Sequence, residues 1–126
     1  MRPVSVLVVD DDSANRALLA AILAREVSAV CTAADAEEAT ALLKGRIFDL
    51  LITDVEMPGL DGIGLSLRVR REWPSVKVIV VSGVANERIR AGAERTGAGA
   101  VLEKPFSPAL LLETIDRLLQ QAERQS

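Results

Sequence analysis

The chain has 126 residues, of which 49% are hydrophobic and 26% are charged, which fits a single globular domain (residues 1–126) with a core from about residue 4 to about 121. Its net charge of −3 disfavours direct binding to nucleic acid, which usually requires a basic patch. The absence of histidine excludes histidine-based catalysis and histidine metal ligands within this chain.

Short apolar runs and longer amphipathic segments alternate along the chain. In chain order, these patterns predict a strand at residues 4–9, a helix at 13–26, a strand at 28–32, a helix capped by residue 35 and ending at 44, a strand at 49–53, a helix at 63–72, a strand at 76–81, a helix at 86–96, a strand at 100–102 and a helix from 107. The polar residues 120–126 predict a frayed tail.

This alternation predicts an α/β fold with five parallel strands and helices on both faces of the sheet. Connections between parallel strands are right-handed, which limits the strand orders that such a chain can adopt. Ligands of these folds bind outside the carboxyl ends of the strands. Reactive side chains are therefore expected at the ends of the predicted strands.

Polar residues follow four of the five predicted strands. They are Asp10, Asp11 and Asp12 after the first strand, Asp54 after the third, Ser82 after the fourth and Lys104 after the fifth. Because the carboxyl ends of parallel strands share one edge of the sheet, these side chains should converge. Taken singly, each has an ordinary explanation as a helix cap, a turn or a surface residue. Their joint occurrence favours a functional site.

Carboxylates gathered at one sheet edge require a counter-charge. Two carboxylates about 4 Å apart repel each other by about 4 kcal/mol at an effective dielectric constant near 20. Oxygen ligands without histidine or cysteine favour a hard cation, above all Mg²⁺, which also binds phosphate oxygens. A carboxylate can accept a phosphoryl group, and a metal ion and a lysine can neutralise its oxygens. The pattern therefore predicts phosphoryl chemistry.

Four sequence motifs resemble those of the receiver domains of two-component response regulators. They are VLVVDDD at residues 6–12, DLLITDVEMPGLDG at 49–62, VIVVSG at 78–83 and EKPF at 103–106. The resemblance covers almost the whole chain. It implies a flavodoxin-like fold with strand order 2-1-3-4-5, five helices, and a role as phosphoacceptor in a phosphorelay rather than as a turnover enzyme.

The resemblance also implies roles for the acidic residues, carried over motif by motif. Asp54 corresponds to the phosphoacceptor. Asp11 corresponds to a direct ligand of Mg²⁺, and Asp10 to the residue that holds metal-bound water. The backbone carbonyl of Glu56 stands where the family supplies a further protein ligand.

The remaining motifs imply the residues that bind the phosphoryl group and respond to it. Ser82 corresponds to the switch hydroxyl and Gly83 follows it in a compliant loop. Lys104 corresponds to the lysine that binds the phosphoryl group, and its bond to Pro105 corresponds to a cis peptide. Many receivers carry an aromatic residue three positions before this lysine, where this chain has Val101. We therefore expect the signal to pass through the backbone after Ser82.

The partners that the resemblance implies are a histidine kinase or histidine phosphotransfer protein and, downstream, a target protein or a second copy of the chain. The fourth helix, fifth strand and fifth helix would form that downstream surface. The chain has one cysteine, Cys31, which is expected to be buried, and it has no signal peptide. These features predict a cytoplasmic protein without membrane insertion.

The Glu56 side chain, two residues after Asp54, is expected either to obstruct or to orient the water that removes the phosphoryl group.

Two other functions compete with this interpretation. Asp10 and Asp12 fit the DxD motif of haloacid dehalogenase phosphatases, although that family needs further motifs and leaves Asp54 and Lys104 unexplained. A phosphorylation-independent interaction module with the same fold is the second alternative. Such modules usually lose the phosphoacceptor or the acid pair, and this chain has both.

Overall fold

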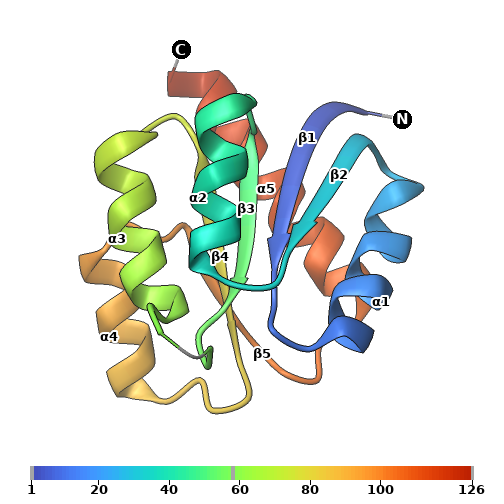
Figure 1. The fold of residues 1–126 in the computed structure, drawn as a ribbon. Helices are drawn as coiled ribbons and strands as arrows, with labels where there is room; N and C mark the ends of the chain where they lie inside the picture. The colour runs from blue at the N-terminus through green and yellow to red at the C-terminus, as the bar shows by residue number, and fades with distance from the viewer. Residues whose placement is uncertain (1, 58, 126) are drawn as a thin grey trace.

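The predicted α/β architecture is confirmed in a computed structural model that describes residues 2–57 and 59–125 (Figure 1). One five-stranded parallel sheet has the order β2-β1-β3-β4-β5. Its elements are β1 (Arg2–Val9), α1 (Ser13–Ala24), β2 (Val27–Ala33), α2 (Ala36–Gly45), β3 (Leu50–Asp54), α3 (Gly62–Glu72), β4 (Lys77–Ser82), α4 (Glu87–Arg95), β5 (Ala100–Glu103) and α5 (Pro108–Gln125).

Two hydrophobic cores lie on opposite faces of the sheet, because successive residues of a strand point to opposite faces. Leu7 and Val9 of β1 belong to the core that α2, α3 and α4 cover. Val6 and Val8 belong to the core that α1 and α5 cover. The same division of helices is visible in Figure 1. With both faces covered, the central strands are buried along their length, which explains their continuous aliphatic runs.

The register of the sheet aligns the strand ends that carry the polar residues. Val9 of β1 pairs with Thr53 of β3, so the residues that follow, Asp10 and Asp54, lie side by side. Asp54 pairs in turn with Val81 of β4. Ser82 then pairs with Glu103 of β5, one residue before Lys104. The four strand ends therefore form one continuous edge.

Several boundaries differ from the prediction by one to three residues. Pairing with neighbours extends β1, β2, β4 and β5 beyond their purely apolar runs, and β3 includes Asp54. Helix α5 continues to Gln125, through most of the tail that was predicted to fray. Cys31 was predicted to be buried and is half-buried.

Pro58 lies outside the described residues. None of the described helices is long and apolar enough to cross a bilayer.

Gly62 at the start of α3 packs directly on the backbone that carries Asp54. A Cβ at this position would lie 2.1 Å from the carbonyl oxygen of Asp54, a distance that requires the backbone to move. The Gly62 amide also donates to the Val55 carbonyl at 3.1 Å. The sequence motif thus places a glycine where α3 must approach the end of β3 closely.

We predict that Gly62→Ala lowers the free energy of unfolding by about 3 kcal/mol, the upper range for inserting a methyl group into a packed site. Gly45→Ala is the matched control, because a Cβ at Gly45, the last residue of α2, meets nothing within 4 Å. That control should be neutral or stabilise by up to about 1 kcal/mol. Urea unfolding of both variants measures the difference. Equal effects would contradict the close approach.

Candidate functional site

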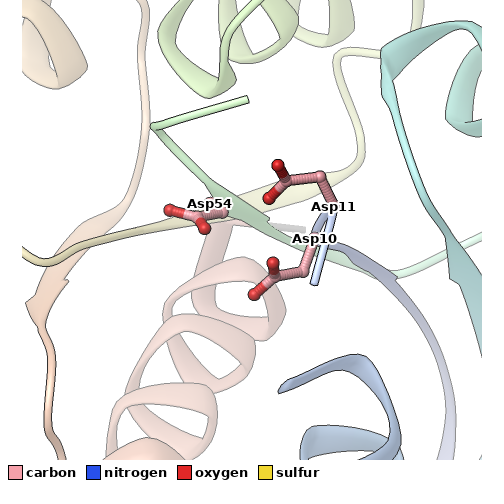
Figure 2. A group of neighbouring side chains, drawn as sticks. All are labelled: Asp10, Asp11 and Asp54. Atoms are coloured by element: carbon pink, nitrogen blue, oxygen red, sulfur yellow. The ribbon is translucent and has the colours of Figure 1, made fainter. Parts of the chain in front are cut away.

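Three carboxylates meet at the carboxyl edge of the sheet. Ligand oxygens of Asp10, Asp11 and Asp54 all lie within 4.8 Å of one another. Figure 2 shows the three side chains extending from two neighbouring strand ends around one region. Asp10 and Asp54 are buried, with 2% and 6% of their surface exposed, whereas Asp11 is exposed. Solvent therefore reaches the cluster at Asp11, while Asp10 and Asp54 are shielded from it.

Hydrogen bonds hold the loop between β1 and α1, and they give Asp10 and Asp12 different roles. The Asp10 amide donates to the Ala33 carbonyl at 3.1 Å. The Asp12 carboxylate accepts from the amides of Ala14 and Asn15, at 2.9 and 3.1 Å, and so caps α1. Asp12 therefore serves the helix. This role differs from the catalytic one that a DxD phosphatase motif would require.

Arg16 is a residue near the cluster that the sequence patterns did not single out. Its Nη1 donates to the backbone carbonyl of Asp10 at 2.6 Å. The Asp12 amide donates to the Asp10 carboxylate at 2.9 Å. Together these bonds hold the backbone and side chain of Asp10 in one orientation. An arginine four residues into a helix gives no sequence signal for such a contact, since it depends on the path of the preceding loop.

Lys104 brings a positive charge to the acidic cluster. Its Nζ lies 2.9 Å from Oδ2 of Asp54 and 3.8 Å from Oδ2 of Asp10. The Lys104 amide donates to the Ser82 carbonyl at 2.8 Å, which ties the loop after β5 to the end of β4. The peptide bond between Lys104 and Pro105 is cis. Lys104 is thus directed to the site by both its backbone and its side chain.

Burial and charge shift the pKa values of this pair. Burial raises the pKa of Asp54 from 3.8 to about 6, although the Lys104 ammonium acts in the opposite direction. For Lys104, burial disfavours the charged form, but the hydrogen bond and the charge of Asp54, with Asp10, raise its pKa overall. Lys104 therefore stays positively charged at neutral pH, while Asp54 carries a charge that its surroundings only partly compensate.

Ser82 and Glu56 form a second polar group beside the aspartates. Ser82 is fully buried, and its Oγ donates to Oε1 of Glu56 at 2.7 Å. The same Oγ accepts from the amide of Val84 at 3.0 Å. The Glu56 amide donates to Oδ1 of Asp54 at 3.3 Å. Burial alone would raise the pKa of the Glu56 carboxyl, but hydrogen bonds with Ser82, Asp54 and its own backbone amide, together with the charge of Lys104, outweigh burial and lower this pKa.

The sequence-predicted residues differ in how closely the structure groups them. Asp10, Asp11, Asp54 and Lys104 lie together, and Ser82 reaches the group through Glu56. Gly83 is exposed in the loop after β4, as the first residue beyond the strand. Val101 is half-buried and packs, as Ile89 of α4 does, against the core that contains Ala93.

The donor set fits a hard divalent cation. The clustered ligand atoms are all carboxylate oxygens, which suit Mg²⁺ better than a soft metal. Asp10 and Asp54 are buried, and Lys104 forms an ion pair with each of them. A bound divalent cation would balance the excess negative charge and lower the pKa of Asp54.

A cavity of about 410 Å³ adjoins the site between α1 and the loop after β5. Asp54 and Lys104 lie at its wall, together with the apolar side chains of Leu18, Ile22 and Phe106. Of these, Leu18 is 62% exposed.

Comparisons with known proteins agree with this geometry. A family model described as the response regulator receiver domain matches residues 6–116. Protein PetR of Rhodobacter capsulatus is 40% identical over 120 residues, which cover 94% of this chain and 49% of PetR. The chain therefore spans about half the length of that curated relative.

Two solved structures illustrate the likeness in three dimensions. A CheY-like response regulator receiver domain protein of Methanospirillum hungatei has a TM-score of 0.93 and 31% identity, covering 98% of this chain and 99% of that one. The response regulator TrrA of Thermotoga maritima, solved in complex with Mg²⁺ and BeF, has a TM-score of 0.82 and 30% identity, covering 94% of this chain and 99% of that one.

The raised pKa of Asp54 predicts a pH-dependent stability difference. In the metal-free protein the folded state binds a proton at Asp54 more tightly than the unfolded state does. Stability from this group is therefore fully present below pH 4 and is lost as the pH rises through about 6. Asp54→Asn cannot ionise. At pH 7.5 we expect the free energy of unfolding of this variant to be about 1–3 kcal/mol higher than that of the wild type. Near pH 4 the two proteins should be equally stable.

Urea unfolding in EDTA at the two pH values measures this difference. Asp61→Asn is a control for removing one negative charge, since asparagine caps a helix about as well as aspartate and this change should therefore not stabilise the protein. A wild type more stable than Asp54→Asn at pH 7.5 would contradict an uncompensated charge on Asp54.

Proposed function

We propose, since this chain belongs to the response regulator receiver domain family, that Asp54 accepts a phosphoryl group from a phosphohistidine of a separate protein. An Asp54 carboxylate oxygen would attack the phosphorus while the phosphorus–nitrogen bond breaks. The imidazole nitrogen leaves with the bonding electron pair. The product is an aspartyl phosphate, and later attack by water on its phosphorus restores the Asp54 carboxylate and releases inorganic phosphate.

The observation that carries this proposal is the pairing of a buried Asp54 with Lys104 at 2.9 Å, next to two further carboxylates. Asp54 is poised to act as a nucleophile because burial deprives its carboxylate of water. Lys104 is close enough to neutralise a phosphoryl oxygen bound to the Asp54 carboxylate. The TrrA structure supports the same chemistry, because it is described as a complex with Mg²⁺ and BeF.

Mg²⁺ would be held by Asp11, Asp54 and the backbone carbonyl of Glu56, with Asp10 holding metal-bound water. When bound, this ion would neutralise charge on the phosphoryl oxygens during transfer. Arg16 maintains the orientation of Asp10 through the Asp10 carbonyl. The register of β1 and β3 keeps the acidic side chains together in spite of their repulsion.

Ser82, with Gly83 after it, would report the phosphorylated state. The hydroxyl would move to a phosphoryl oxygen and take the backbone of the following loop with it, since the Val84 amide is bonded to Oγ. The downstream surface would be α4, β5 and α5, which a target protein or a second copy of the chain could bind. The proposed upstream partner is a histidine kinase or histidine phosphotransfer protein, and the proposed location is the cytoplasm.

The haloacid dehalogenase alternative has weaker support. Its second aspartate would be Asp12, whose carboxylate is engaged by the amides of α1. A phosphorylation-independent module would have no need for Asp54 and Lys104 in contact. Stoichiometric labelling of the chain, without continued turnover of a phosphate monoester, would separate the proposed function from both alternatives.

Incubation with acetyl phosphate and Mg²⁺ should add one phosphoryl group to Asp54, which intact mass measures. Asp54→Asn should give no full-size adduct, because an amide is a poor nucleophile. Asp11→Ala should reduce the reaction at least about 100-fold through loss of a metal ligand. A full adduct on Asp54→Asn would refute the assignment of the phosphoacceptor.

A second expectation concerns the route of the signal past Val101. A β-branched side chain has few χ1 states, so Val101 cannot swing like a ring. Comparison of the free and beryllofluoride-bound protein by NMR should show large shifts at residues 82–86 and small ones at the Val101 methyl groups. Ser82→Ala should still bind beryllofluoride but lose most of the loop shifts. Large Val101 shifts with a static loop would contradict this route.

A further inference from the structure

We infer that the side chain of Glu56 is a positioning residue that holds the Ser82 hydroxyl in the unphosphorylated arrangement and competes with a phosphoryl group for its single proton. This inference rests on the proposed function of Asp54 and concerns regulation of the same site. It assigns to Glu56 a role separate from that of its backbone carbonyl.

The hydrogen bond between Ser82 and Glu56 is the first support. Oγ of Ser82 donates to Oε1 of Glu56 at 2.7 Å, a length typical of a hydroxyl bonded to a carboxylate. A serine hydroxyl has one proton to donate. Ser82 is fully buried, so water does not offer an alternative acceptor at its position. To donate to a phosphoryl oxygen, Ser82 must first release Glu56.

The same hydroxyl is connected to the backbone of the loop after β4. The Val84 amide donates to Oγ of Ser82 at 3.0 Å. The next amide, that of Ala85, donates to Oε2 of Glu103 at 3.3 Å. Two carboxylates therefore hold the start of this loop in one position. Glu56 acts through the hydroxyl and Glu103 acts on the backbone directly.

The bond to Glu56 exists only while Ser82 is not bonded to a phosphoryl group, so it stabilises one of two states. A contact confined to one state shifts the equilibrium between the states by its own free energy. Glu56 is exposed, so water can solvate its carboxylate once Ser82 leaves. This solvation limits the expected effect to about tenfold.

A carboxylate near the phosphoryl group would also oppose it by charge alone, and the two effects require different variants. Glu56→Gln removes the charge but keeps an oxygen that can accept from Ser82. Glu56→Ala removes both. Glu26→Ala serves as the matched control, because Glu26 is an exposed carboxylate just before β2, at the opposite end of the sheet.

The first experiment uses the unmodified protein without any phosphoryl analogue. Amide exchange and NMR shifts at Val84 report the bond to Ser82. We expect Glu56→Ala to shift the Val84 amide and to speed its exchange about tenfold, while Glu56→Gln and Glu26→Ala stay close to wild type. Unchanged exchange at Val84 in Glu56→Ala would overturn the inference, whatever the outcome of phosphorylation experiments.

The second experiment measures beryllofluoride affinity in the presence of Mg²⁺ for wild type, Glu56→Ala, Ser82→Ala and the double variant. Glu56→Ala should bind about tenfold more tightly than wild type, and the gain should vanish when Ser82 is alanine. An equal gain in both backgrounds would show repulsion by charge and overturn the inference. Failure of the wild type to bind would count against the proposed function, and the Val84 measurement would still decide the role of Glu56.

Discussion

The concentration of negative charge at one edge of the sheet is the constraint on which the rest of the structure depends. Ligand oxygens of Asp10, Asp11 and Asp54 lie within 4.8 Å of one another, and Asp10 and Asp54 are buried. Carboxylates that close repel by several kcal/mol even at a moderate dielectric constant. Carboxylates on free loops would separate. Lys104 compensates part of this charge, and a bound divalent cation would balance the remainder.

The two hydrophobic cores supply the rigidity that this arrangement needs. The strands β1, β3 and β4 are central in the sheet and buried on both faces, so the acidic residues emerge from the least mobile part of the fold. This packing extends up to the site, because Gly62 of α3 lies directly against the backbone carbonyl of Asp54. Stability provided by the cores thus offsets the electrostatic cost of the site, a common arrangement in functional proteins.

The network around Ser82 links this rigid site to a more exposed loop. A buried hydroxyl connects the Glu56 carboxylate with the Val84 amide. Beyond it the chain is exposed at Gly83 and Val84. A small rearrangement at the buried hydroxyl would therefore move an exposed backbone, without any large change in the cores. Val101, half-buried beside α4, has a β-branched side chain with few χ1 states, so a large rearrangement at this position is not expected.

The sequence alone determined the secondary-structure elements and the positions of the reactive residues at the strand ends. Strand and helix periodicity depends on neighbouring residues, so the five strands, the five helices and the polar residues at the strand ends could be predicted from the chain. The tertiary structure decided the rest. Residue type alone does not distinguish Asp10, Asp11 and Asp12, and only the family resemblance assigned them different roles. The path of the loop makes Asp12 a helix cap and buries Asp10. Likewise the contacts of Arg16 with the Asp10 carbonyl and of Glu56 with Ser82, 26 residues away, depend on side-chain direction and loop path, which no periodicity encodes.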